Sequence, residues 1–258
     1  MPSNCRRILI VLCLLCLAPL ALGAQEGEAP VYSYVAEWSV PRPQWGDFTY
    51  AFERVQRPVL EKALADGNLI SWGVYTNIVH TPDGMTHGVW FSSATLAGLE
   101  KARTELIKQP PNQGMLAATM HRDYLLQSVF HRGKTTGPAS GYLSVEGWLV
   151  KPGKGQEWRK LWEKNYKPIY DELLDNGTIL AYGLDRESVH TEDPGWLYLY
   201  TVSPSAEAED KVPATFRAAA EKWTEEERKA LTQAFFLDLT VPEAHRDMWA
   251  LLSAYAHK

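Results

Sequence analysis

The chain has 258 residues, with 26 basic and 31 acidic side chains and a formal net charge of −5. No block of basic residues stands out, so the composition argues against a nucleic-acid partner. The three cysteines, Cys5, Cys13 and Cys16, all lie near the N-terminus. The rest of the chain can therefore form no disulfide, thiolate metal site or cysteine nucleophile, and its hydrophobic core must stabilise it.

Residues 1–23 have the layout of a secretory signal peptide. Arg6 and Arg7 precede an uncharged run from Ile8 to Leu22, and a small-residue site ends at Gly23. This run is shorter than the ~20 residues that a membrane-spanning helix needs, so cleavage near Gly23 is favoured over a membrane anchor. No later apolar run approaches that length. We expect a soluble, extracytoplasmic protein, either periplasmic or secreted.

The chain repeats itself with an offset of 110 residues. Residues 36–93 align with residues 146–203 without a gap, and 12 of these 58 positions are identical. Unrelated segments of average composition would share roughly 6%. The identical pairs include Trp38/Trp148, Pro58/Pro168, Gly67/Gly177, Gly73/Gly183 and His80/His190. A duplication of this length determines the architecture better than any local signal does.

Apolar periodicity and turn residues predict the same order of elements in both repeats. In the first repeat we expect a strand at 34–40, a helix at 48–66, a hairpin of strands 69–80 and 87–93, a helix at 95–108 and a strand at 124–131. In the second repeat these become 142–150, 158–176, 179–190 with 196–202, 213–236 and 248–257. Pro58 and Pro168 fall inside the first helices and predict a kink or two abutting helices. Gly67 and Gly177 should end them as left-handed caps.

The order β-α-β-β-α-β, read twice, is that of a duplicated ferredoxin-like unit. We place the first repeat at 31–132, a linker at 133–140 and the second repeat at 141–258. This α+β layout resembles the dimeric α/β-barrel superfamily, in which two such sheets face each other in a barrel with helices outside. The superfamily includes proteins of the NIPSNAP, EthD and antibiotic-biosynthesis-monooxygenase types, and haem proteins of the chlorite-dismutase and dye-decolorising-peroxidase type. The resemblance covers residues 31–258 and rests on element order and duplication.

Two repeated motifs are candidate sites. His80 and His190 each begin a His-Thr-x-Asp motif at a hairpin turn, and histidine is the usual proton carrier near neutral pH. The same residues can instead build the turn through bonds from side chain to backbone, and this interpretation is favoured. The tripeptide His-Arg-Asp occurs at 121–123 and 245–247. We expect a local Arg–Asp pair that fixes the start of the last strand.

Alternation along the strands predicts an aromatic face on both sheets. We expect six aromatic residues to face a small apolar or aromatic ligand, or to fill the barrel: Trp38, Trp72, Trp90, Trp148, Tyr182 and Tyr200.

The second repeat also carries a charge pair that the first lacks. Glu146 and Arg186 stand where the first repeat has Ala36 and Thr76. With His190 they could supply a catalytic base and an anion stabiliser, although a structural ion pair is the favoured interpretation. The difference between the copies predicts that any polar pocket lies in the second repeat.

Three functions follow as hypotheses. The first is a binding protein for a small apolar or aromatic ligand. The alternative is an oxidoreductase, either a cofactor-independent monooxygenase or a haem enzyme with His190 or His245 as the axial ligand. The third is a structural module. We expect no metal, and either a monomer with pseudo-twofold symmetry or a homodimer. The sequence does not identify a cofactor: the absence of one is favoured, and haem is the alternative. The sequence leaves open whether the protein is an enzyme.

Overall fold

A computed structural model of the chain describes residues 30–81 and 84–258. The signal peptide predicted at 1–23 lies outside these residues. The first repeat forms β1 (Tyr32–Ser39), α1 (Trp45–Ala51), η2 (Phe52–Gln56), α2 (Arg57–Ala65), β2 (Ser71–Asn77), β3 (His87–Ser93), α3 (Leu96–Ile107), α4 (Gln113–Leu116) and β4 (Met120–Gly133). The second repeat forms β5 (Thr136–Leu149), α5 (Gly155–Asn165), α6 (Lys167–Asp175), β6 (Ala181–Glu187), β7 (Trp196–Ser203), α7 (Ala206–Ala220), α8 (Glu225–Thr232), η3 (Gln233–Asp238) and β8 (Arg246–His257).

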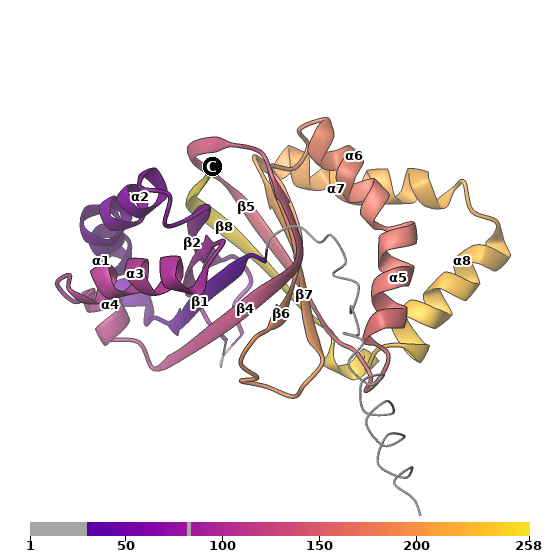
Figure 1. Ribbon diagram of the computed structural model, residues 1–258, viewed down its shortest axis with the longest axis horizontal. Coiled ribbons are helices and arrows are strands. Elements are labelled where there is room, and N and C mark those ends of the chain that lie inside the picture. Colours follow the sequence, from indigo (N-terminus) through magenta and orange to yellow (C-terminus); the bar gives the residue numbers. More distant parts are fainter. Residues whose placement is uncertain (1–29, 82–83) are drawn as a thin grey trace, which may run out of the picture.

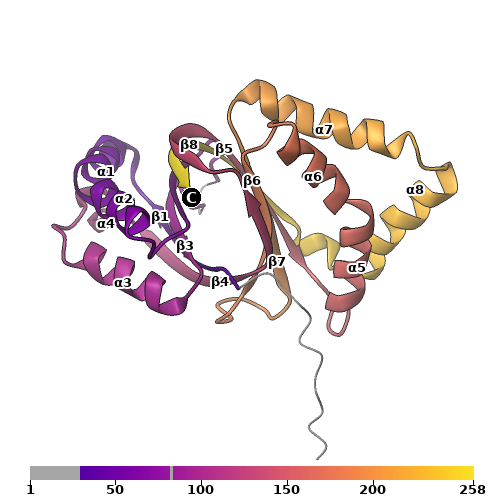
Figure 2. The same cartoon turned by 45° about the horizontal axis from the view of Figure 1, so that its top comes forward.

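The eight strands close into one antiparallel barrel in the order β1-β3-β2-β8-β5-β7-β6-β4. Each repeat contributes a four-stranded sheet, β4-β1-β3-β2 or β8-β5-β7-β6, and the two sheets join at their edges through β2–β8 and β4–β6. The helices of the two repeats lie at opposite ends of the molecule, with the barrel between them (Figures 1 and 2). The barrel therefore has no open sheet edge, which removes a site of aggregation.

The pairing of the first three strands has the same register in both repeats. Tyr34 pairs with Phe91 across β1 and β3, and their counterparts Ser144 and Thr201 pair across β5 and β7. Thr95 caps α3 by accepting the N–H of Gly98, and Ser205, again 110 residues later, caps α7 in the same way. The offset read from the sequence therefore holds in three dimensions as far as the second helix.

The barrel sheet has two differently packed faces. Its outer face packs against helices and forms one core in each repeat. Its inner face brings side chains of both repeats together, among them Tyr75, Trp90, Tyr200 and Tyr255. Close packing on the inner face requires glycine at two of the repeated positions. A Cβ on Gly73 would collide with the ring of Trp90 opposite it, and one on Gly183 would collide with Tyr200.

The predicted breaks and caps of the first helices are confirmed. Pro58 lies near the start of α2, after the π-helical segment η2, and Pro168 lies near the start of α6, after α5. Proline lacks the N–H for a continuous helix but is accepted in a first turn. Gly67 and Gly177 end these helices with φ of 76° and 81°, values that favour glycine.

Two predicted boundaries were wrong. The predicted helix at 213–236 is α7 and α8, separated at Thr224, which caps α8 through a capping box with Glu227. Pro213 lies inside α7 rather than at its start, because the N-cap is Ser205. Most of the predicted linker at 133–140 belongs to β5, which begins at Thr136. Only Lys134 and Thr135 separate the end of β4 from the start of β5, although the two strands are not neighbours in the barrel.

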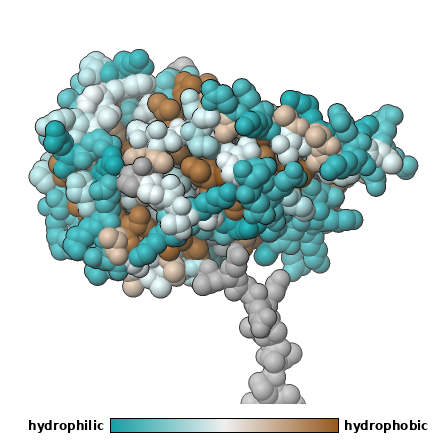
Figure 3. Space-filling view, turned by 90° about the horizontal axis from the view of Figure 1, so that it is seen from above, coloured by the Kyte–Doolittle hydropathy of each residue, from teal (hydrophilic) through white to brown (hydrophobic). Residues whose placement is uncertain are grey.

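In the described part of the chain, none of the helices combines the length and the apolar character needed to cross a bilayer. Hydrophilic side chains cover much of the face seen in Figure 3, including the end of the molecule where α7 meets α8.

Candidate functional site

A cleft opens in the second repeat between the outer face of the sheet and the helices α6 and α7. Its volume is about 370 Å³, which is within the range of small-ligand sites. Strands β5 and β7 form its floor, and the two helices form its walls. The lining residues combine carboxylates and hydroxyls with apolar and aromatic side chains: Ser144, Glu146, Tyr170, Leu199, Thr201, Glu209, Val212, Pro213, Phe216 and Arg217.

The cleft exists because small polar residues replace an aromatic pair. In the first repeat the rings of Tyr34 and Phe91 lie 5.3 Å apart and fill the space under the helices. At the same ladder positions the second repeat has Ser144 and Thr201. Each replacement removes a ring, and part of the space stays accessible as the cleft.

Three more positions of this layer change from apolar to polar. Ala36, Leu60 and Leu99 are buried in the core of the first repeat. Their counterparts at the offset of 110 residues are Glu146, Tyr170 and Glu209. Carboxylates are rarely buried without partners because desolvation penalises them, so this set is unlike an ordinary core.

Glu146 lies at the floor of the cleft. Burial raises the pKa of its carboxyl group, and the nearby carboxylate of Asp247 raises that pKa further. Trp148 and His245 act in the opposite direction but do not reverse the shift. Glu146 is thereby suited to accept or donate a proton closer to neutral pH than an exposed glutamate would.

Glu209 enters the cleft from the wall formed by α7. Its Oε2 accepts a hydrogen bond of 2.8 Å from the hydroxyl of Ser144. Its Oε1 is buried and has no hydrogen-bond partner among the described residues. Pro213, one turn later, lacks the N–H that would bond the carbonyl of Glu209 in a regular helix. Because Oε1 of Glu209 has no partner, the cleft presents an unsatisfied carboxylate oxygen that could accept a hydrogen bond from a ligand.

The structure does not assemble the predicted trio of Glu146, Arg186 and His190. Arg186 lies on the same face of the sheet as Glu146 but two strands away, roughly 10 Å across the ladder. Arg186 is exposed and donates to Gln127 over 2.9 Å. His190 is exposed in the β6–β7 connection. Among these three residues only Glu146 lines the cleft.

The expected single aromatic face was also wrong, because the six predicted ligand-binding aromatics divide between the two faces of the sheet. Four of them pack between sheet and helices, and two point into the barrel. The outer group is Trp38, Trp72, Trp148 and Tyr182, and the inner group is Trp90 and Tyr200. None of the six lines the cleft. The error arose on the third strand of each repeat, which carries Trp90 or Tyr200. The register of the hairpin, and not the local sequence, decides which alternate residues of that strand point into the barrel.

The His-Arg-Asp tripeptides form pairs other than those predicted. The histidine, and not the arginine, pairs with the aspartate: His121 with Asp123 and His245 with Asp247, each at 3.0 Å. Each histidine also packs on the repeated tryptophan of its own half, Trp38 or Trp148. This packing fixes the start of the last strand.

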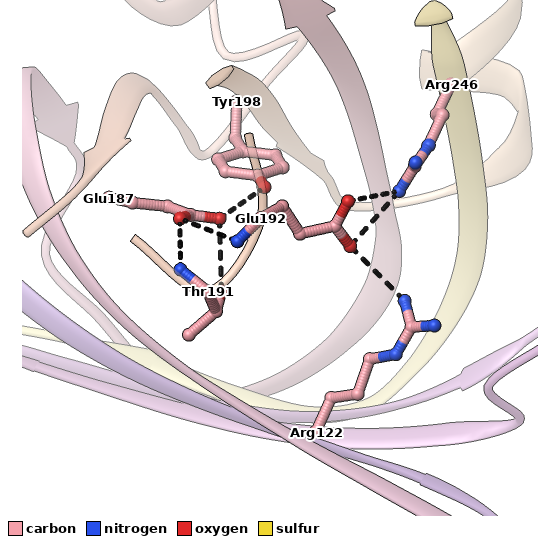
Figure 4. A network of polar contacts seen from close by, with 6 residues as sticks. All are labelled: Arg122, Glu187, Thr191, Glu192, Tyr198 and Arg246. Atoms are coloured by element: carbon pink, nitrogen blue, oxygen red, sulfur yellow. Dashed lines mark hydrogen bonds and ion pairs between the residues drawn. The ribbon is translucent and has the colours of Figure 1, made fainter. Parts of the chain in front are cut away.

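The two arginines of these tripeptides instead converge on one carboxylate at an end of the barrel. Arg122 and Arg246 reach Glu192 from strands β4 and β8, over 3.4 and 3.1 Å (Figure 4). Beside them, Glu187 accepts hydrogen bonds from the hydroxyl of Tyr198 and the backbone N–H of Thr191 (Figure 4). Glu192 and Thr191 belong to the β6–β7 connection, so these bonds hold that connection to the barrel rim.

The His-Thr-x-Asp motif therefore has a structural role in at least one copy. Thr191 anchors the connection through Glu187, while His190 points to solvent. In the first copy, His80 packs against the ring of Trp45. Asp83 lies outside the described residues. This arrangement is consistent with the favoured turn interpretation.

The barrel interior holds a polar cluster that the sequence did not indicate. The Nε2 atoms of His131 and His257 lie 2.9 Å apart, and Nδ1 of His131 bonds to the hydroxyl of Tyr200. Asp185 accepts a bond of 2.6 Å from Ser128. Burial raises the pKa of Asp185 to about 7 and lowers that of His131 to about 4. These residues come from four strands, so no local motif could have grouped them.

Comparison with known proteins places the fold. No protein-family model matches the chain, and no curated protein matches its sequence. A candidate monooxygenase from Lactobacillus acidophilus NCFM is similar at a TM-score of 0.64 and 9% identity, over 89% of this chain and 97% of its own. A second candidate monooxygenase, from Fusobacterium nucleatum, is similar at a TM-score of 0.60 and 12% identity, over 89% of this chain and 95% of its own. A mutant chlorite dismutase from Candidatus Nitrospira defluvii is similar at a TM-score of 0.53 and 11% identity, over 86% of this chain and 91% of its own.

The chain has the dimeric α/β-barrel fold. The expected architecture, with two ferredoxin-like repeats closing a barrel in one chain, is therefore confirmed. At these identities the likeness to monooxygenases and chlorite dismutase concerns the fold of this α/β barrel and does not extend to its chemistry.

The residues of the cleft do not fit haem, the cofactor that the fold makes relevant. A haem site needs an axial ligand, most often histidine, and no histidine is among the residues that line the cleft. His245, the nearest candidate, bonds to the carbonyl of Gly147 through Nδ1 and to Asp247 through Nε2, so both ring nitrogens are engaged. His190 lies in the exposed connection. Within the described ranges there is also no group of three or more His, Cys, Asp or Glu arranged to hold a metal ion.

Proposed function

We propose that this α/β barrel binds a small, mainly apolar ligand in the cleft of its second repeat. The observation that carries the proposal is the replacement of the Tyr34–Phe91 ring pair by Ser144 and Thr201. The exchange leaves a cleft of about 370 Å³ at the position that the ring pair fills in the other repeat. Its apolar residues would hold the body of the ligand, and its few polar groups would orient it.

The test is to fill the cleft with the residue that the first repeat uses. Thr201→Phe reproduces Phe91 and should occupy the space. A panel of aromatic and aliphatic small molecules would be screened by thermal shift, and hits would be measured by calorimetry. We expect Thr201→Phe to weaken binding by at least about tenfold, or 1.4 kcal/mol.

Thr135→Phe, at an exposed position outside the cleft, is the matched control and should bind as the unaltered protein does. Equal affinity of all three proteins would exclude the cleft as the binding site.

A second candidate function is cofactor-independent oxidation with Glu146 as general base, and the raised pKa of its buried carboxyl group favours it. Glu146 would take the proton of an activated CH2 group, and dioxygen would accept the electrons: one oxygen atom replaces the two hydrogens of that carbon as a carbonyl, and the other leaves as water. Anthrone is a suitable first substrate because an anthrone oxidase-like protein shares the fold at a TM-score of 0.52. Oxygen uptake that disappears in Glu146→Gln would support this function, and uptake unchanged by that substitution would exclude Glu146 as the base.

We also propose that residues 1–23 direct export and are then removed, because their charge and apolar pattern is that of a signal peptide. N-terminal sequencing of the protein from extracytoplasmic fractions should begin near Ala24. An intact N-terminus on protein found inside the cell would contradict export.

A further inference from the structure

We infer that the cleft selects ligands whose polar end is an organic ammonium group. This inference rests on the proposed ligand-binding function of the same cleft and specifies the charge that the cleft accepts.

The cleft contains two carboxylates that face the same space. Glu146 and Ser144 point to one face of β5, and residues two apart on a strand lie about 7 Å from each other. The Ser144 hydroxyl holds Glu209 at 2.8 Å. The carboxyl groups of Glu146 and Glu209 are therefore close enough for one ligand group to approach both.

The negative charge of Glu146 is felt by its neighbours. The pKa values of Tyr166 and Tyr170 are raised by burial and also by the charge of Glu146. Asp247, which pairs with Glu146 across β5 and β8, adds negative charge near the floor of the cleft. The interior of the cleft thus favours cations and disfavours anions.

No described cation forms an ion pair with either carboxylate. Arg217 lines the cleft, but it is exposed at the rim, where water and salt screen its charge. Oε1 of Glu209 is buried without a hydrogen-bond donor. Because an unpaired buried carboxylate is costly, a ligand cation would supply the missing counterion.

The walls indicate an organic cation rather than a hydrated inorganic ion. The rings of Tyr170 and Phe216 meet edge to face at 5.0 Å beside the carboxylates, and Leu199 and Val212 complete an apolar surface. Aromatic faces attract ammonium groups through cation–π interactions. The combination suits an ammonium group attached to an aromatic or alkyl body.

Three probes of the same shape separate charge from apolar burial. The purified protein would be titrated at pH 7.5 with 2-phenylethylammonium, 2-phenylethanol and phenylacetate. We expect the amine to bind at least about tenfold more tightly than the alcohol, and the acid to bind most weakly, a ratio worth about 1.4 kcal/mol. In the Glu146→Gln/Glu209→Gln variant the amine should lose this advantage while the alcohol keeps its affinity. Glu207→Gln, an exposed change on the same helix, is the matched control.

A permanently charged probe, phenyltrimethylammonium, tests the carboxylates through pH. Because burial raises the pKa of Glu146, its carboxyl group stays protonated to higher pH than an exposed glutamate does, so affinity for this cation should rise with pH above the ordinary glutamate range. The other groups that face Glu146 are Tyr166 and Tyr170, His245 and Asp247, and Glu209 across the cleft. Glu146→Gln should flatten most of the profile if Glu146 is the group that titrates.

Each outcome decides the inference. Equal or tighter binding of the alcohol or the acid would overturn the preference for a cation and leave the proposed ligand-binding function standing. Unchanged binding of the amine by the double variant would place the cation elsewhere and overturn the inference as well. Binding of none of the three probes would overturn it too. If the wider panel also fails to bind, the proposed function fails with it.

Discussion

In the first repeat, Tyr34 and Phe91 pack ring against ring beneath α2 and α3, whereas Ser144 and Thr201 occupy the same ladder positions in the second repeat and leave a cleft. The strand order, the register between the first and third strands, and the caps at Thr95/Ser205 and Gly67/Gly177 are the same in both halves. The difference shows that one duplicated framework can hold a tightly packed layer in one copy while the other copy exchanges packing for polar groups.

The largest expected effect comes from opening the packed half. Phe91→Thr copies the second repeat into the first and removes a buried ring, so we expect the free energy of unfolding to fall by about 3–4 kcal/mol. Denaturant unfolding measures it. Thr201→Val in the cleft is the matched control and should change stability by less than about 1 kcal/mol. A loss below about 1 kcal/mol in Phe91→Thr would mean that the two halves do not differ in packing as described.

The barrel interior offers the next comparison, because Asp185 stands where the first repeat has Tyr75. Burial raises the pKa of Asp185 to about 7, well above that of an aspartate in the unfolded chain. The folded state therefore keeps a proton that the unfolded chain has released, and its stability falls as pH rises from about 4 to 7. Asp185→Asn should remove this loss and raise the free energy of unfolding at pH 8 by roughly 2–4 kcal/mol relative to the unaltered protein.

His131 has the opposite effect, because its pKa is lowered to about 4: it lowers stability at acid pH, and this loss disappears as the pH rises from about 4 to 6.5. It is present in both proteins, so their difference reports Asp185 alone. The difference should shrink at pH 4. Asp193→Asn, which is exposed, should show no such trend. A gain from Asp185→Asn that is the same at pH 4 and pH 8 would contradict the buried, protonated carboxyl.

The ion network at the barrel rim is asymmetric. The carboxylate that both arginines contact, Glu192, belongs to the second repeat, whereas Arg122 comes from the first repeat and Arg246 from the second. Glu192→Gln should lower the free energy of unfolding by about 1 kcal/mol at low salt, because the pairs are partly exposed. The effect should shrink at 1 M salt. Glu243→Gln, exposed and outside the network, is the control. A salt-independent loss would point to packing in place of charge.

The smallest effect concerns the rim of the cleft. Arg217→Gln removes a like charge at the entrance, so 2-phenylethylammonium should bind about twofold more tightly, a small change because water screens the exposed guanidinium. Calorimetry at low salt resolves it. Weaker binding of the amine in this variant would show that Arg217 holds the ligand and does not repel its charge.

The duplicated sequence predicted the helix caps at Gly67 and Gly177, the helix breaks at the repeated prolines and the barrel itself. It also identified Glu146 as a polar residue of the second repeat at a position where the first repeat has the apolar Ala36. Comparison of the pairs Tyr34/Ser144 and Leu99/Glu209 at the same offset would have revealed the cleft, but both pairs lie outside the aligned block of residues 36–93. The boundaries of α7 were missed because Pro213 looked like a helix start.

By itself, the sequence determined the repeat, the order of elements and the polar substitutions that distinguish the copies, because these depend on periodicity and residue type along the chain. Only the tertiary structure decided which strand face lies inside the barrel, which residues share the cleft with Glu146, and that both arginines of the repeated tripeptide meet at Glu192. Those contacts join strands and helices far apart in sequence. They follow from strand register and barrel closure, which no local pattern encodes.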